Sequence, residues 1–190
     1  MKITIRKLTL MSVLTAVALI VFIIEAQIPL PVPIPGAKLG LANTVTLFAL
    51  FYGKIGKTDK TDKTDKTEEP SSRLARLTTL DAFMILICRI ILGAVFTGRI
   101  IAFIYSIAGG LLAFAAQAAV RRFVTNKQVW ACGAVGAVFH NIGQIAAAML
   151  ITGTPSIVAY LPLLIIAGVI TGVVTGFVAQ FTLARVAKQN

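Results

Sequence analysis

Arg89 is the residue that most needs a chemical explanation, because it is a cation inside a long apolar run. A cation at the centre of a membrane costs about 2.5–3.5 kcal/mol on insertion scales, so it is expected to face protein, water or a counter-ion. A second polar group stands in a later apolar run, where His140, Asn141 and Gln144 lie close together. A helix places His140 and Gln144 on one face, since they are four residues apart. This pattern is typical of side chains that bind an anionic or carbonyl group of a ligand.

Three more polar residues stand where apolar runs end or begin. Glu25 lies near the end of the first run, and Lys38 and Asn43 lie near the start of the second. The predicted substrate-binding set is therefore Arg89, His140, Asn141, Gln144, Asn43, Lys38 and Glu25. Two interpretations of Arg89 stay open: a buried ion pair with Glu25 that holds the helices together, or a cavity in which Arg89 binds the ligand. No cofactor or metal is expected.

The elements that must position these residues are apolar helices. The chain has 190 residues, 57% of them hydrophobic, against about 45–50% in ordinary soluble domains. A membrane-spanning helix needs about 20 mostly apolar residues. The sequence predicts an all-α integral membrane protein, a six-helix bundle in a single domain over 1–190. The expected spans are Leu8–Ile28, Leu39–Tyr52, Leu80–Phe96, Ile100–Val120, Val129–Ile151 and Ile157–Leu183.

The basic residues indicate how the chain is threaded. Fifteen of the eighteen Lys and Arg residues lie before the first run, between runs two and three, between runs four and five, or after the sixth. Cytoplasmic loops carry an excess of Lys and Arg, so both termini are expected in the cytoplasm. The net charge of +11 then marks loops rather than one continuous basic face, which argues against nucleic-acid binding.

Two connecting segments have unusual compositions. Residues 57–72 repeat Thr-Asp-Lys and contain no apolar residue that could be buried, so they are predicted to form a flexible cytoplasmic linker. Proline recurs at every second position from Pro29 to Pro35, which favours an extended segment. This segment is interpreted as either a stiff external connector or a flap over a substrate site.

Small residues indicate where helices approach one another. Gly168, Gly172 and Gly176 are four residues apart and form one face of the last helix, suited to packing within the bundle or against a partner protein. Ser12 and Ala16 form a weaker pair of the same kind on the first helix.

The sequence lacks the groupings that catalysis needs. It has no phosphate-binding loop of the ATPase type, no paired carboxylates at a plausible site and no Ser/His/Asp set. Cys88 and Cys132 lie in apolar runs with no metal-ligand spacing. The chain is therefore not expected to be an enzyme by itself.

Several blocks of the sequence together resemble the Gx transporter family, which is also catalogued as heptaprenyl diphosphate synthase component I. These blocks are residues 35–47, Arg89–Gly93, Tyr105–Gly110, Gly136–Gln144, Tyr160–Pro162 and Gly168–Gly176, and the resemblance covers nearly the whole chain. The family in turn is similar to the S components of energy-coupling-factor (ECF) transporters, six-helix membrane proteins that capture a vitamin-like molecule. The linker at 57–72 is longer than this resemblance leads one to expect.

The resemblance implies two different functions in a bacterial plasma membrane. The first is capture of a small anionic or carbonyl-bearing molecule, isoprenoid-, quinone- or vitamin-like, from outside. Uptake would be driven by a coupling membrane protein and two ABC ATPases, with Ser12 and Ala16 at the positions that dock on the coupling protein. The second is a non-catalytic membrane subunit that works with the catalytic subunit of heptaprenyl diphosphate synthase in menaquinone or isoprenoid synthesis. Prenyl synthases hold magnesium with Asp-rich pairs, whereas Asp59, Asp62 and Asp65 stand singly, so a catalytic role in chain elongation is not expected. Transport is favoured, because a soluble synthase subunit would have no need of six spans.

Overall fold

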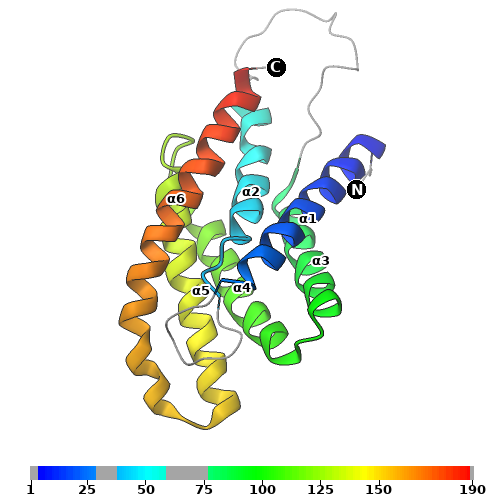
Figure 1. Cartoon of the computed structure of the whole chain (residues 1–190). Helices are drawn as coiled ribbons and strands as arrows, with labels where there is room; N and C mark the ends of the chain where they lie inside the picture. Colours follow the sequence, from blue (N-terminus) through cyan, green and yellow to red (C-terminus); the bar gives the residue numbers. More distant parts are fainter. Residues whose placement is uncertain (1–3, 29–37, 59–76, 189–190) are drawn as a thin grey trace, which may run out of the picture.

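The structure is a computed structural model, and it describes residues 4–28, 38–58 and 77–188. Every regular element in these ranges is helical: α1 (Ile5–Glu25), α2 (Asn43–Thr58), α3 (Thr79–Thr97), α4 (Ile100–Val120), α5 (Val129–Thr152), the short 3₁₀ helix η1 (Pro155–Tyr160) and α6 (Leu161–Lys188). The first turn of α1 and the last turn of α6 lie in the upper part of the molecule, and the α5–η1–α6 connection lies at the opposite end (Figure 1).

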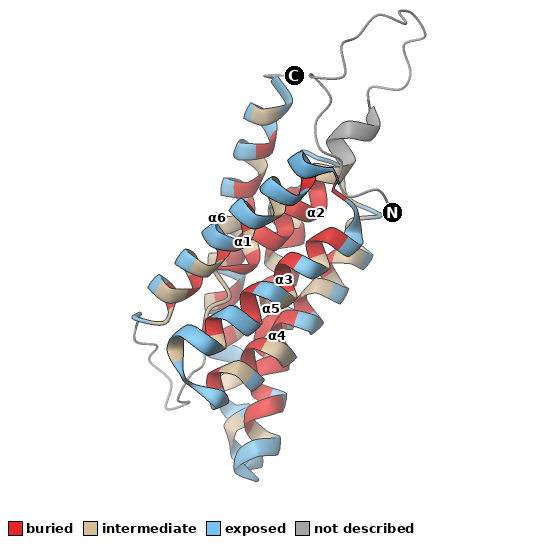
Figure 2. Ribbon diagram, turned by 90° about the vertical axis from the view of Figure 1, so that its right-hand side faces the viewer, coloured by how far each residue is buried: buried red, intermediate tan, exposed pale blue. Residues whose placement is uncertain are grey.

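Five of the helical segments are long and apolar enough to cross a membrane, and they begin at Ile5, Thr79, Ile100, Val129 and Pro155. Many large apolar side chains on the outward faces are exposed, for example Val95 and Leu150. Figure 2 shows the pattern, with exposed residues on the outer faces of the helices and buried residues between them. Because a water-soluble surface rarely carries so much contiguous apolar area, the chain is a multi-pass membrane protein.

Five of the six predicted spans correspond to helical segments long and apolar enough to cross a membrane; the second, at α2, is not among them in the part of the chain that the structure describes. The span at Ile100–Val120 matches α4 to the residue. The second predicted span, Leu39–Tyr52, begins four residues later, at Asn43, and extends to Thr58. With 16 residues, α2 is about 24 Å long, shorter than a hydrocarbon core of about 30 Å. The helix after η1 also continues five residues beyond the predicted end, to Lys188.

Most residues of the two unusual connecting segments fall outside the ranges that the structure describes. Of the predicted linker over residues 57–72, the first two residues belong to the end of α2, and the rest falls outside the described residues. The proline-rich segment over residues 29–36 also falls outside them.

α3 has clear start and stop signals. At its start, the Thr78 side chain accepts a hydrogen bond from the Asp81 backbone N–H, and the Asp81 carboxylate accepts from the Thr78 N–H, which is a capping box. At its end, Gly98 adopts φ +62°, a left-handed conformation that glycine adopts without strain. These signals fix the ends of the helix that carries Arg89 near its middle.

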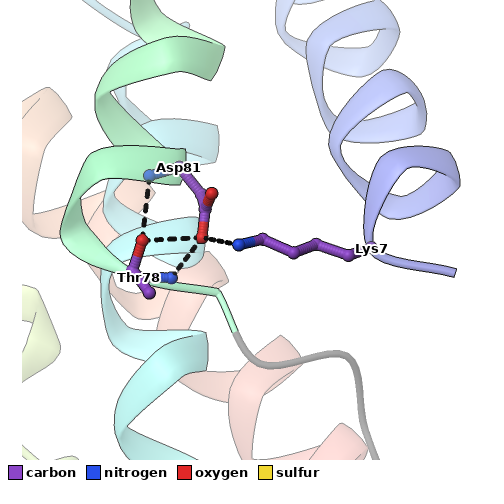
Figure 3. Close-up of polar contacts among 3 residues, drawn as sticks. All are labelled: Lys7, Thr78 and Asp81. Carbon is purple, nitrogen blue, oxygen red and sulfur yellow. Dashed lines mark hydrogen bonds and ion pairs between the residues drawn. The ribbon is translucent and has the colours of Figure 1, made fainter. Parts of the chain in front are cut away.

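An ion pair joins α1 to the start of α3. The Lys7 ammonium lies 2.7 Å from Asp81 Oδ2, and both side chains are nearly inaccessible. The same carboxylate accepts hydrogen bonds from Thr78 N and Oγ1 at 2.6 and 2.7 Å (Figure 3). The N-terminal end of α1 is thereby held against α3.

The glycines of α6 lie against α5. A methyl group on Gly172 would come 2.7 Å from the Gly133 carbonyl oxygen, and one on Gly176 would come 2.5 Å from Trp130 Cα. Gly168 faces Asn141 in the same way. These contacts lie inside the protein, in one of its two most extensive helix pairs, α5 with α6; the other is α4 with α5.

Candidate functional site

The site is built around the start of α2, which lies beside the end of α1. Glu25, the last residue of α1, is buried, and its carboxylate accepts hydrogen bonds from the backbone N–H groups of Gly40, Leu41 and Ala42. The Leu41 and Ala42 bonds measure 3.0 and 3.4 Å. N–H groups at a helix start have no partner within the helix and carry partial positive charge, so a carboxylate there is favourable.

Gly40 makes this close arrangement sterically feasible. It adopts φ +83°, which favours glycine, and a methyl group on it would come 2.9 Å from the His140 ring. Gly109 of α4 lies on another side of the same ring, where a methyl group would come 2.7 Å from His140 Nδ1. The imidazole is therefore enclosed by backbone that has no side chains of its own.

A chain of hydrogen bonds crosses the bundle through this ring. Arg89 Nη2 donates to Asn43 Oδ1 at 3.1 Å, and Asn43 Nδ2 lies 3.1 Å from His140 Nδ1. On the other side, the Lys38 backbone N–H donates to Gln144 Oε1 at 3.2 Å, and Gln144 Nε2 lies 3.0 Å from His140 Nε2. All five residues are buried. The chain therefore links α3, α2, α5 and the segment before α2.

Donors approach His140 from both sides. Arg89 orients the Asn43 amide so that its NH₂ group faces the ring, and the Lys38 N–H orients the Gln144 amide in the same way. A neutral imidazole accepts at one nitrogen and donates at the other. The Gly109 backbone is a further hydrogen-bond partner of the ring, so the imidazole N–H donates to the Gly109 carbonyl and the other ring nitrogen accepts from an amide.

Two cations meet at the Phe22 ring. Lys38 Nζ lies 3.1 Å from the ring centroid and Arg89 Cζ lies 6.0 Å from it, a contact that favours cations. Gly93, one turn beyond Arg89, leaves space for this ring. Lys38 Nζ and Arg89 Nε are buried and have no hydrogen-bond partner in the structure.

The ion pair between Arg89 and Glu25 that the sequence left open is not formed. Within the described residues, Lys7 and Asp81 are the ion pair at 4.0 Å or less. Glu25 uses its carboxylate on backbone N–H groups instead. Arg89 therefore has Asn43 as its hydrogen-bonding partner and no carboxylate in contact.

Of the seven predicted substrate-binding residues, the structure brings six together and separates one. Asn141 points toward α6, where Nδ2 donates to the Leu164 carbonyl at 2.5 Å, and its Oδ1 has no partner.

Ser12 and Ala16 lie on the exposed side of α1, away from the network. No group of three potential metal ligands from His, Cys, Asp and Glu occurs among the described residues.

Sequence reasoning missed two parts of this arrangement. Phe22 has no polar atom, but it recurs with Leu14, Ala18 and Glu25 on the buried face of α1, and that spacing could have placed it beside Glu25. The Lys7–Asp81 pair was also missed, although both residues stand next to the same predicted membrane face.

A small pocket opens on the other side of the start of α2. Its lining includes Asn43, Thr44, Gln117, Thr171 and Thr175, and its volume is about 10 Å³. This is about the size of one water molecule and far below the volume of usual ligand pockets, about 300–1,000 Å³. Asn43 belongs both to this lining and to the Arg89–His140 network.

The comparisons with known proteins gave one family. A family profile described as heptaprenyl diphosphate synthase component I matches residues 14–58 and 72–182, which is most of the chain. The search of curated proteins and the search of solved structures gave no match.

Proposed function

The chain belongs to the heptaprenyl diphosphate synthase component I family, and we propose that it is the membrane-embedded substrate-binding component of a transporter. Its ligand is a small anionic or carbonyl-bearing molecule, with an isoprenoid-, quinone- or vitamin-like body. The ligand is captured from outside a bacterial plasma membrane, with both termini of the chain in the cytoplasm. A coupling membrane protein and two ABC ATPases drive the uptake.

One observation carries this proposal: a buried, donor-rich network lies in the middle of apolar helices. Arg89 is the eleventh of the 19 residues of α3, and His140 is the twelfth of the 24 residues of α5. Ionisable residues inside membrane spans are costly, and they commonly mark substrate pathways. Arg89 contacts no carboxylate among the described residues, so its buried charge is left for a ligand to offset.

The short helix α2 supports the same proposal. Transporters often bind their ligands where a membrane helix is interrupted, because the free helix end presents unpaired backbone groups. Here α2 begins beside Arg89 and His140 rather than at the outer end of a full-length span. We place the substrate-binding role on Arg89, His140, Gln144, Asn43, Lys38 and Glu25, with Asn141 supporting α5 against α6. Ser12 and Ala16 on the exposed side of α1 are the proposed contact with the coupling protein.

A second candidate function follows from the family description. In it, the chain is the non-catalytic membrane subunit of heptaprenyl diphosphate synthase and binds the catalytic subunit of that enzyme in menaquinone or isoprenoid synthesis. This function explains a membrane-bound partner, but it gives the buried Arg89–His140 network no role.

Purification of the tagged protein from mild detergent, with its partners identified by mass spectrometry, separates the two functions. Recovery of ABC-type ATPases together with a membrane coupling protein supports transport. Recovery of a prenyl synthase catalytic subunit without ATPases overturns it. Two variants test the docking surface. The double variant Ser12→Leu/Ala16→Leu, on the exposed side of α1, is expected to lose the coupling protein. The control Val174→Leu, on the exposed side of α6, is expected to retain it.

Arg89→Ala tests the site itself. Small molecules are extracted from the purified wild-type protein and the variant and compared by untargeted mass spectrometry. A compound that co-purifies with the wild type is expected to be absent from Arg89→Ala and retained by Arg99→Ala, whose side chain is exposed. Equal recovery from both variants contradicts a ligand-binding role for Arg89.

A further inference from the structure

Three charged side chains meet at the start of α2, and their charges do not cancel. Lys38, Arg89 and Glu25 are 6%, 3% and 3% exposed, which leaves one net positive charge from these three buried side chains. An uncompensated buried charge is strongly unfavourable. The nearby Asn43, His140 and Gln144 do not bring a negative charge.

The one carboxylate is already occupied. Glu25 accepts three backbone hydrogen bonds from residues 40–42 and contacts neither cation within 4.0 Å. It therefore stabilises the start of α2, while Lys38 Nζ and Arg89 Nε remain without acceptors.

Both cations lie beside the Phe22 ring, and their distances to it set an upper limit on their separation. Lys38 Nζ and Arg89 Cζ are no farther apart than the sum of their distances to its centroid, 3.1 and 6.0 Å. A carboxylate that accepts one hydrogen bond of about 2.8 Å on each oxygen spans a comparable distance. Such a group supplies the acceptors that Lys38 Nζ and Arg89 Nε lack, whereas an amine would bring further donors.

We propose that the ligand presents a singly charged oxyanion, a carboxylate, to Lys38 and Arg89 beside Phe22, and that Glu25 sets the preference for a single negative charge. This proposal rests on the ligand-binding role assigned to the site above. It adds the charge of the recognised group and a specificity-determining role for Glu25, which acts by its charge from the start of α2.

Simple acids test the proposal without knowledge of the natural ligand. Binding of acetate, benzoate, benzamide and phenyl phosphate to the purified protein in mild detergent at pH 7.0 is measured by thermal unfolding. Acetate and benzoate are expected to stabilise the wild type. Benzamide, without the charge, and phenyl phosphate, with two charges, are expected to bind about thirtyfold or more weakly than benzoate, as loss or mismatch of one buried charge partner implies. Failure of both carboxylates to stabilise the protein, or equal effects of benzoate and benzamide, overturns the proposal.

Three variants assign the effect to residues. Lys38→Met keeps the backbone bond to Gln144 and removes only an ammonium without a hydrogen-bond partner, so it should fold and lose benzoate binding. Asn43→Asp supplies a fixed negative charge and an acceptor for both Arg89 and His140, so it should unfold at a higher temperature than the wild type and no longer bind benzoate. Glu25→Gln adds one net positive charge and should shift the preference toward phenyl phosphate.

The exposed Arg99→Gln is the matched control for a general loss of positive charge and should bind benzoate as the wild type does. Unchanged benzoate binding in both Lys38→Met and Asn43→Asp overturns the oxyanion site. An unchanged order of preference in Glu25→Gln overturns its selecting role. These results are independent of the partner purification: benzoate binding together with recovery of a prenyl synthase catalytic subunit and no ATPases would refute the transport function and leave the anion site standing.

Discussion

The Lys7–Asp81 ion pair should be a strong stabilising contact, and a double-mutant cycle can measure it. The pair is short, 2.7 Å, and its side chains are 9% and 2% exposed, so solvent screens it little. The perturbations are Lys7→Met and Asp81→Asn, which keep most of the side-chain volume and remove one charge each. An Asn at position 81 still offers an oxygen to the N–H of Thr78, so the cap is partly preserved.

The magnitude follows from burial. Removal of one partner of a buried pair leaves the other charge uncompensated and typically costs about 3–5 kcal/mol. Each single variant is expected in this range. The double variant leaves neither charge, so its cost should be well below the sum of the two, with a coupling energy of about 2 kcal/mol or more.

Unfolding can be followed by labelling of the buried Cys132 with a thiol-reactive fluorophore, in a Cys88→Ser background because Cys88 is exposed. The exposed Lys127→Met serves as the matched control and should be neutral. Additive effects of the two single variants in the double variant would show that Lys7 and Asp81 do not stabilise each other and would refute the reasoning.

Three other perturbations test the packing and the network. Gly172→Ala should destabilise the protein by about 1–3 kcal/mol, because its methyl group would overlap the Gly133 carbonyl. The control Ala184→Val, on the exposed side of α6, should be tolerated in the same unfolding assay. Asn43→Leu should cost about 1–3 kcal/mol, because it leaves buried donors of Arg89 without a partner; a smaller loss than that of Gln144→Leu would contradict the central place of Asn43. In the folded protein, an apolar maleimide that partitions into the detergent should modify Cys88, which is exposed on the membrane-facing side of α3, much faster than Cys132, and equal rates measured by mass spectrometry would contradict the buried position of Cys132.

The long helices could be predicted because apolar length determines them. Ile100–Val120 is bounded by charged residues on both sides, Arg99 and Arg121, and the sequence gives its ends directly. The start of α2 could not be read in this way, because apolar residues continue across it from Leu39. What fixes the start of α2 is a carboxylate from another helix, Glu25, which accepts hydrogen bonds from the free N–H groups of residues 40–42. No local pattern in the sequence encodes that contact.

The candidate site was predictable as a group but not in its pairings. Similar positions along their helices brought Arg89 and His140 to one level, and the four-residue spacing correctly placed Gln144 beside His140. Asn141 was grouped with them by sequence proximity, but one residue further along a helix turns the side chain by about 100°, which directs Asn141 toward α6. The sequence suggested either Glu25 or a ligand as the partner of Arg89, but the structure pairs Arg89 with the Asn43 amide. The Glu25 carboxylate instead accepts hydrogen bonds from three backbone N–H groups.

The position of the network within the fold gives it a further consequence. α4, α5 and α6 are joined by extensive contacts and by glycine packing, while α1 contacts mainly α3 and α2 and is fixed by polar groups at its two ends, Lys7 and Glu25. α2 packs against α6 as well as against α3 and α1, and the bonds Asn43–His140 and Lys38–Gln144 attach its start to α5. Lys38 Nζ and Arg89 Nε have no acceptor at this junction, so an oxyanion bound to both would join the segment before α2 to α3.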